Sequence, residues 1–257
     1  METPPGFAQY PRPQGLTSGV RALPPGAHIE AIGEAYTLFS REWTTWVAAT
    51  LVAVGIYIVL YIPTLFVSSY LQYGDFSIAP QPGRLPNPVG FLESFLFSLV
   101  PACVYTMLGA GMIKMAIRQI RGLPIQVSDV FSGFRDVPRL IGAYICFAIM
   151  MLVGTIFCCI PGLWVMGAFS LTPFLIIDQK MGVFEALGAS YRAAGGIVVG
   201  LTMFGLLILL SLVHSAGLIA CGVGVLASLP VALIAMTIHY YYFFPEAFPS
   251  TPTPAFS

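Results

Sequence analysis

The chain has few charged residues for its length. Charged residues make up only 9% of its 257 residues, whereas hydrophobic residues make up 57%. Ordinary soluble domains contain roughly 25% charged residues, and a chain of this length could not surround so apolar an interior with so few charges. The composition therefore excludes a water-soluble globular fold and predicts an integral membrane protein.

An excess of charge of one sign is also absent. Lysine and arginine together number 11, as do aspartate and glutamate. Proteins that bind nucleic acid usually carry a basic patch or stripe, because the phosphate backbone dominates their affinity. Nucleic acid is therefore not an expected partner. The expected partners are membrane lipids, together with a protein partner or a second copy of the chain.

The sequence lacks the motifs of several large enzyme classes. It contains no His-Glu-x-x-His helix, no Gly-x-Ser-x-Gly elbow and no phosphate-binding glycine-rich loop that ends in lysine and serine or threonine. Its few charged residues offer no pair of carboxylates to share acid and base work. We therefore expect no enzymatic activity, no catalytic residue, no cofactor and no bound metal.

Long apolar runs are what the chain has in abundance. Crossing roughly 30 Å of hydrocarbon takes about 20 apolar residues in a helix. We predict an all-α, polytopic membrane protein with six transmembrane helices at about 44–70, 89–117, 140–159, 163–177, 196–218 and 222–244. The fourth run is short and contains Pro173. A turn at Pro161 and Gly162, and a short connection around Gly222, are expected to join consecutive spans as hairpins.

Three short amphipathic segments, at 32–39, 130–134 and 184–191, each precede a pair of spans. Apolar residues at helical spacing with polar residues between them are typical of helices that lie in the headgroup region. The order indicates three hairpins, each with its own amphipathic cytoplasmic helix. Residue identity between the three units is slight and their lengths differ, so the sequence leaves open whether the repeat is real.

Positive charge predicts the orientation. With six spans, eight basic residues close to the spans lie on one side, and Arg84 alone lies on the other. Basic residues favour the cytoplasmic side, so both termini are expected there. The eight are Arg41, Lys114, Arg118, Arg121, Arg135, Arg139, Lys180 and Arg192. The terminal stretches 1–28 and 245–257 are rich in proline and polar residues and are predicted to be disordered.

Several short motifs, taken in order, carry a resemblance. The succession of IGEAYTLF, of DVFSGF before a span, and of IPGLW, TPFLIID and EALGAS resembles six-helix prokaryotic membrane proteins of the YciC-like type and the membrane domain attached to some glycerophosphodiester phosphodiesterases. The resemblance covers about 29–244 and implies a six-helix fold in a prokaryotic cytoplasmic membrane. These families are mostly without assigned activity, so it implies no catalytic residue.

Two acidic residues are candidate polar sites. Asp178 ends the fourth span, beside Lys180 and shortly before an amphipathic segment. Its carboxylate could cap helix N–H groups or pair with Arg139 or Arg192, and the alternative is coordination of a substrate or ion. Glu93 lies near the outer end of the second span, within reach of water.

His214 and His239 fall within the fifth and sixth spans. An ionisable residue inside a membrane is by default a functional candidate, here for proton transfer or metal binding. A neutral imidazole is nevertheless cheap to bury, so structural hydrogen bonding is the favoured interpretation. The two histidines lie near opposite membrane faces, which argues against a shared metal site.

Small residues in the fifth span predict close helix packing. Gly196, Gly200 and Gly205 form a smooth strip of the kind that lets helix backbones approach. Two cysteine-bearing connections are predicted on the same outer face, where a disulfide could persist. We therefore hypothesise a bridge from Cys158 or Cys159 to Cys221.

Two functions from different classes remain. The first is a non-catalytic scaffold or accessory component that interacts with lipid or partner proteins. The second is a transporter or channel-like protein for a small or lipid-like solute, supported by a proline in four of the six spans and by the hairpin repeat. The scaffold is preferred because few polar groups are available to line a pathway.

Overall fold

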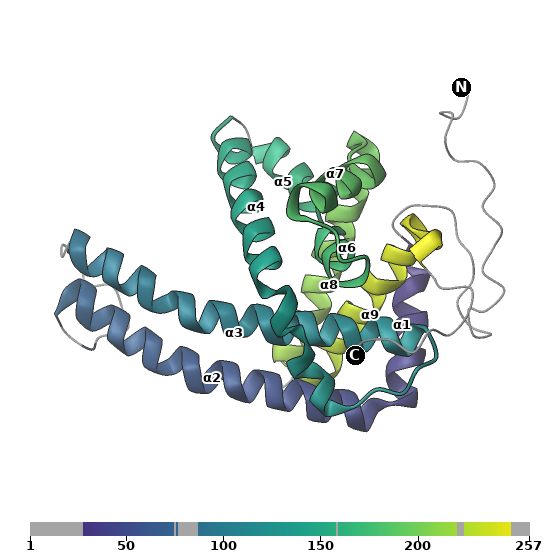
Figure 1. Cartoon of the computed structure of the whole chain (residues 1–257), viewed down its shortest axis with the longest axis horizontal. Helices are drawn as coiled ribbons and strands as arrows, with labels where there is room; N and C mark the ends of the chain where they lie inside the picture. Colours follow the sequence, from purple (N-terminus) through teal and green to yellow (C-terminus); the bar gives the residue numbers. More distant parts are fainter. Residues whose placement is uncertain (1–27, 75, 77–86, 158, 220–223, 248–257) are drawn as a thin grey trace.

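The computed structural model describes residues 28–74, 76, 87–157, 159–219 and 224–247, and this part of the chain is helical without any β-strand (Figure 1). The elements in chain order are α1 (Glu30–Arg41), α2 (Trp43–Tyr73), α3 (Pro88–Ile120), the 3-10 helix η1 (Val127–Asp136), α4 (Val137–Phe157), α5 (Cys159–Ala168), α6 (Thr172–Asp178), α7 (Val183–Ala194), α8 (Ile197–Ile219), α9 (Val225–Phe243) and the 3-10 turn η2 (Pro245–Ala247). The tails 1–27 and 248–257 and the loop residues 220–223 lie outside the described residues.

Within the described residues, six helical stretches are long and apolar enough to cross a membrane: 43–73, 88–120, 127–156, 161–178, 197–215 and 225–243. This confirms the predicted fold class. The first two stretches are longer than a bilayer requires. At 1.5 Å per residue, α2 and α3 measure roughly 46 and 50 Å, against about 30 Å of hydrocarbon. They form a hairpin that extends away from the rest of the molecule in Figure 1.

The fourth span consists of two helices. α5 ends at Ala168, and α6 begins after a turn at 169–171, with Pro173 in its first turn. Proline is tolerated there because its missing N–H would have no partner inside the helix. The turn predicted at Pro161 and Gly162 is wrong, because both residues lie in the first turn of α5, where a proline is likewise tolerated.

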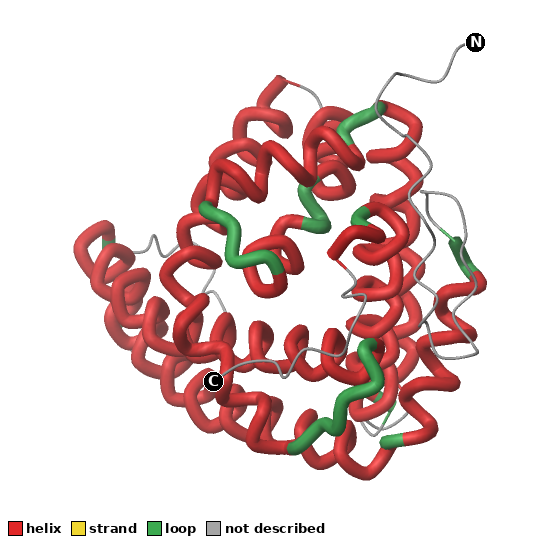
Figure 2. Tube along the Cα trace, turned by 45° about the vertical axis from the view of Figure 1, so that its right-hand side comes forward, coloured by secondary structure: helices red, strands yellow, loops and turns green. Residues whose placement is uncertain are grey.

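The helices pack as three hairpins, and Figure 2 shows helices on all sides of the molecule, joined by short connections. α2 packs on α3, α4 on α5, and α8 on α9. Neighbouring hairpins meet in the same way each time, since α3 contacts α4, α5 contacts α8, and α9 contacts α2. The last helix of each hairpin therefore lies beside the first helix of the next, and the third hairpin closes on the first.

The amphipathic elements connect these hairpins. α1 packs mainly on α9, η1 on α3, and α7 on α6, with further contacts to α4 and α5. Each element therefore rests on the last helix of the neighbouring hairpin, while the chain leads on from it into its own hairpin. The same contact therefore recurs three times around the molecule, which supports the predicted three-part organisation. Each hairpin depends on a neighbouring hairpin for its packing.

The three amphipathic elements share a pattern of burial. In each amphipathic element an acidic residue is followed by a fully buried one, in the pairs Glu34-Ala35, Asp129-Val130 and Glu185-Ala186. A second buried residue lies three positions further on, namely Leu38, Gly133 and Ala189. The approach is closest at η1, where a Cβ on Gly133 would collide with the backbone of α3.

α9 lies at the centre of the packing. Of its most apolar 18-residue window, 72% is buried inside the protein, compared with 11% for α2. Its buried face carries Ile234, Ile238 and Tyr240 against a core that includes Met115 and Leu175. The large apolar side chains on the outer halves of α2 and α3 are exposed, as membrane lipid requires.

Candidate functional site: a buried polar network where the three hairpins meet

The C-terminal ends of α3, α6 and α9 converge at one end of the molecule, which we call the polar end. Asp178, the last residue of α6, has a side chain that is only 2% exposed. Its Oδ1 lies 2.6 Å from Nη2 of Arg121, which directly follows α3. Its Oδ2 accepts a hydrogen bond of 2.9 Å from the hydroxyl of Tyr240 on α9. One carboxylate therefore joins all three hairpins.

The partners of Asp178 are themselves held in place. Gln179 donates a hydrogen bond of 3.0 Å from Nε2 to the Tyr240 hydroxyl. Nη2 of Arg121 also donates to the carbonyl oxygen of Ala247 at 3.1 Å, and the guanidinium lies 5.9 Å from the ring centre of Tyr241. Both carboxylate oxygens are thus bound by protein groups, which agrees with the structural interpretation of Asp178.

The ion-pair partner differs from the two that the sequence suggested. Arg121 binds Asp178 because the C-terminal part of α3 packs on α6. Arg139 instead donates from Nη1 to the carbonyl oxygen of Lys180 at 3.2 Å. Arg192 is exposed on α7. Pairing with Arg139 or Arg192 is therefore wrong.

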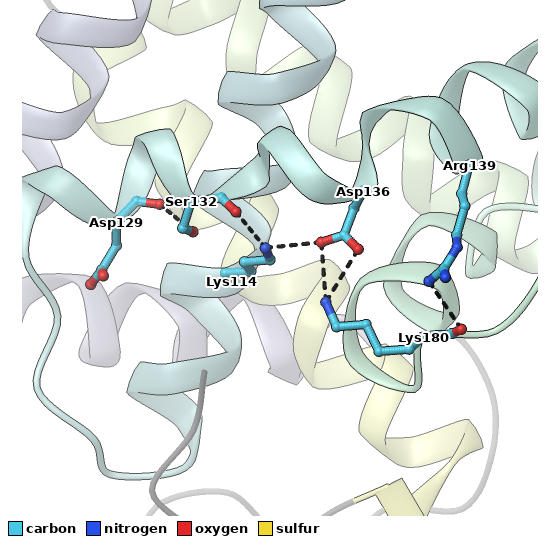
Figure 3. A network of polar contacts seen from close by, with 6 residues as sticks. All are labelled: Lys114, Asp129, Ser132, Asp136, Arg139 and Lys180. Carbon is cyan, nitrogen blue, oxygen red and sulfur yellow. Dashed lines mark hydrogen bonds and ion pairs between the residues drawn. The ribbon is translucent and has the colours of Figure 1, made fainter. Parts of the chain in front are cut away.

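A second buried carboxylate lies nearby, shown in Figure 3. Asp136, at the end of η1, has a side chain that is 3% exposed and lies between two lysines. Its Oδ2 is 2.9 Å from Nζ of Lys114 on α3 and 3.1 Å from Nζ of Lys180 in the loop after α6. Lys114 also donates to the carbonyl oxygen of Ser132 at 2.6 Å. Asp136 therefore connects the first hairpin to both ends of the second.

The backbone at Lys180 is bent to make this contact. Its φ of 57° lies in the left-handed region, which a residue with a Cβ adopts at a cost of about 1–2 kcal/mol. This conformation turns the chain sharply after α6 and brings the ammonium back over Asp136. The ion pair and the hydrogen bond from Arg139 hold the strained residue in place.

Sequence reasoning overlooked three members of this network, namely Lys114, Arg121 and Asp136, as site residues. The sequence did indicate that Lys114 is unusual, because this lysine interrupts the apolar run 107–117 within a span. A charge at such a position needs a buried partner. The identity of that partner was not readable from the sequence, because Asp136 follows 22 positions later in a segment that looks like an ordinary polar surface helix.

His239 is satisfied by backbone groups on both sides of its ring. Nε2 accepts a hydrogen bond of 2.9 Å from the backbone N–H of His28, so Nδ1 carries the proton. Nδ1 donates that proton to the carbonyl oxygen of Ala235 at 2.7 Å. The imidazole is therefore neutral, and neither ring nitrogen is left to bind a ligand.

His214 lies in a different place. Its Nδ1 is 3.3 Å from the hydroxyl oxygen of Ser228, where α8 meets the first turns of α9. Ser228 precedes His239 by about 16 Å along α9, so the two histidines do not share a site. Within the described ranges, no group of three or more His, Cys, Asp or Glu side chains is placed to hold a metal ion. Glu93 is exposed near the start of α3.

Only one of the three predicted packing glycines lies at a close helix crossing. A Cβ on Gly200 would come within 2.7 Å of the Trp164 ring, and one on Gly167 of α5 would collide with the Gly200 carbonyl. A Cβ on Gly205 would meet nothing within 4 Å, and one on Gly196 only a side-chain atom at 3.9 Å. The role predicted for Gly196 and Gly205 in packing within the bundle is therefore wrong, because the close approach of α8 to α5 lies at Gly200 and Gly167.

The predicted disulfide lies outside the described residues, which exclude Cys158, Cys221 and the side chain of Cys159. Cys103 and Cys146 are both free and half-buried within their helices.

An apolar cavity of about 180 Å³ lies between α4, α5, α6, α7 and α8. The side chains that line it include Leu140, Ala143, Phe147, Met166, Leu187 and Leu207. Neither Asp178 nor His214 borders it. The charged network and this cavity are therefore separate features.

Six apolar spans make the chain a multi-pass α-helical membrane protein. Comparison of the chain with protein-family models, with curated proteins and with solved structures finds no match of any of the three kinds.

Proposed function

We propose that this protein is a non-catalytic component of a prokaryotic cytoplasmic membrane, where it serves as a scaffold or accessory subunit for membrane lipid and a partner protein. The observation that carries the proposal is the use made of the buried charges. Asp136 and Asp178 each bind a cation of the first hairpin, Lys114 at 2.9 Å and Arg121 at 2.6 Å, and Asp136 also binds Lys180 at 3.1 Å. Pairing of this kind holds the hairpins together and engages both carboxylates with protein groups, while Nε of Arg121 makes no hydrogen bond among the described residues.

The alternative, transport of a small polar solute, is less well supported. A pathway for such a solute needs polar groups that replace its hydration shell. The cavity between α4 and α8 is lined mainly by apolar side chains, and Asp178, His214 and His239 lie elsewhere. The helix break at Pro173 is explained by packing, since it lets α6 turn Asp178 toward Arg121.

The amphipathic elements support an interaction with lipid. Each exposes a large aromatic side chain on the surface opposite its buried face: Tyr36 is 62% exposed, Phe134 73% and Phe184 81%. Aromatic rings on short amphipathic helices are typical of the membrane interface. The polar end also carries most of the basic residues, which supports a cytoplasmic position for α1, η1 and α7 and for both termini.

The proposal is tested by isolating the chain from its native membrane in a lipid-retaining polymer and identifying the bound proteins by mass spectrometry. We expect one protein to be recovered in a fixed ratio to the chain. A variant with Phe134 and Phe184 both changed to serine should recover less of it, whereas the matched change of the lipid-facing Phe97 to serine should not.

A separate measurement addresses transport and catalysis. The purified chain is reconstituted in liposomes, and the leakage of protons, cations and a neutral dye is compared with that of empty liposomes. Equal leakage is expected. Selective solute movement that Asp178→Asn abolishes would contradict the scaffold proposal.

A further inference from the structure

The wall of the cavity between α4 and α8 includes a residue whose hydroxyl is not used by the packing. Thr172, at the start of α6, borders the cavity and is 3% exposed. Its hydroxyl has no hydrogen-bond partner among the residues that the structure describes. A buried hydroxyl without a partner costs about 1–3 kcal/mol, so the site favours any occupant that supplies the missing group.

The size and walls of the cavity select the kind of occupant. A cavity of about 150 Å³ lined by apolar side chains stays dry and accepts a molecule the size of benzene. At about 180 Å³, this cavity suits a short stretch of hydrocarbon chain. Besides Thr172, the polar lining residues are Tyr144 and Ser170, whose hydroxyl already donates to the carbonyl oxygen of Gly167. The other lining residues are apolar, so the cavity favours hydrocarbon over a water that needs two to four polar partners.

The position of the cavity indicates where that hydrocarbon comes from. Tyr144 and Phe147 of α4 form part of its wall, and Tyr144 is 47% exposed on a membrane-spanning helix. The cavity therefore opens sideways to the bilayer. Thr172 precedes Asp178 of the polar end by six residues, or about 9 Å along the helix axis. A phospholipid chain entering here would have its ester group, a hydrogen-bond acceptor, close to the depth of this hydroxyl.

Two of the helices that line the cavity carry exposed positive charge. Arg139 is exposed directly before Leu140, which lines the cavity, and Arg192 is exposed on α7, which contributes Leu187. On α7, Glu185 is engaged with the backbone N–H of Gly182. An exposed basic residue near a membrane surface attracts anionic headgroups by about 1 kcal/mol.

We propose that this cavity binds one acyl chain of an anionic phospholipid, with the lipid ester accepting a hydrogen bond from Thr172 and the headgroup lying against Arg139 and Arg192. The inference rests on the proposed lipid-interacting function and specifies the lipid and its site. It makes the second hairpin and α7 the part of the scaffold that holds a lipid molecule in a fixed place.

The test uses the full chain in lipid nanodiscs that contain a phosphatidylglycerol with a photoreactive diazirine in its acyl chain. After illumination, we expect labelled peptides from α4 and α6. Ala143→Leu fills the cavity and should abolish this labelling. Ala148→Leu makes the same change on the exposed face of α4 and should leave labelling unchanged.

Two further variants separate binding from folding. Thr172→Val keeps the shape of the side chain and removes the hydroxyl, so it should lower labelling by about threefold to tenfold, the range that one hydrogen bond provides. Changing Arg139 and Arg192 to glutamine should remove the preference for phosphatidylglycerol over a phosphatidylcholine probe with the same acyl chain.

Several results would overturn the inference. Labelling that Ala143→Leu and Thr172→Val leave unchanged would show that no acyl chain occupies the cavity, and equal labelling by the two probes would exclude an anionic lipid. Should the partner protein still be recovered with the chain, only this inference fails. Selective solute movement in liposomes would instead contradict the proposed scaffold function itself.

Discussion

The pair formed by Arg121 and Asp178 allows a quantitative test of the buried network. Changing Asp178 to leucine removes the carboxylate and leaves the guanidinium, 14% exposed, without its partner in the protein interior. Removing one member of a buried ion pair costs about 3–5 kcal/mol. At about 2–4 °C per kcal/mol for a chain of this size, the midpoint of thermal unfolding should fall by roughly 6–20 °C.

A double variant separates this effect from simple loss of packing. Changing Arg121 to methionine and Asp178 to leucine together replaces both charges by apolar groups, an exchange that is often neutral or stabilising. The double variant should therefore be more stable than Asp178→Leu alone. The measurement is thermal unfolding in a mild detergent, followed by tryptophan fluorescence. Glu93→Leu serves as the control, because this exposed carboxylate should change stability by less than about 0.5 kcal/mol.

The reasoning is refuted if Asp178→Leu unfolds at the temperature of the unmodified chain. It is also refuted if the double variant loses as much stability as the two single variants added together, since independent sites behave in that way.

Three other changes can be measured in the same assay. Lys114→Met should destabilise more than Lys180→Met, because the Lys114 side chain is 7% exposed and the Lys180 side chain 43%; equal losses would contradict the assignment of Lys114 as the buried partner. Tyr240→Phe should cost about 1.5–3 kcal/mol, as expected for a hydrogen bond to a charged group, and an unchanged midpoint would argue against that bond. Gly200→Leu should prevent α8 from crossing α5, whereas Gly205→Ala should be tolerated; similar behaviour of the two variants would place the crossing elsewhere.

The sequence was sufficient to predict the class of fold. Apolar runs long enough to cross a bilayer and a charge content of 9% leave few alternatives to a helical membrane protein. The amphipathic segments were also recognisable, because the spacing of apolar residues identifies a buried face before the packing partner is known. That spacing does not reveal that α1 packs on α9, nearly 200 residues away in the chain.

The polar network could be predicted only in part. Asp178 stands out as an acid at the end of a span, but its partner Arg121 lies 57 positions earlier and is one of several arginines near the spans. Glycine spacing likewise suggested a strip on α8, whereas the close contact depends on Gly167 of another helix. Both pairs of residues come together because of how the helices cross, and a local sequence pattern does not reveal those crossings. The resemblance to YciC-like proteins stays a prediction.

Orientation is the claim on which the scaffold proposal depends most. In a cysteine-free background, single cysteines are introduced in place of Phe134 on η1 and of Glu93 near the start of α3, both of which are exposed. A membrane-impermeant maleimide added to intact cells should modify the cysteine at 93, and it should reach the cysteine at 134 only after the cells are permeabilised. Modification at 134 in intact cells would contradict six spans with the polar end in the cytoplasm.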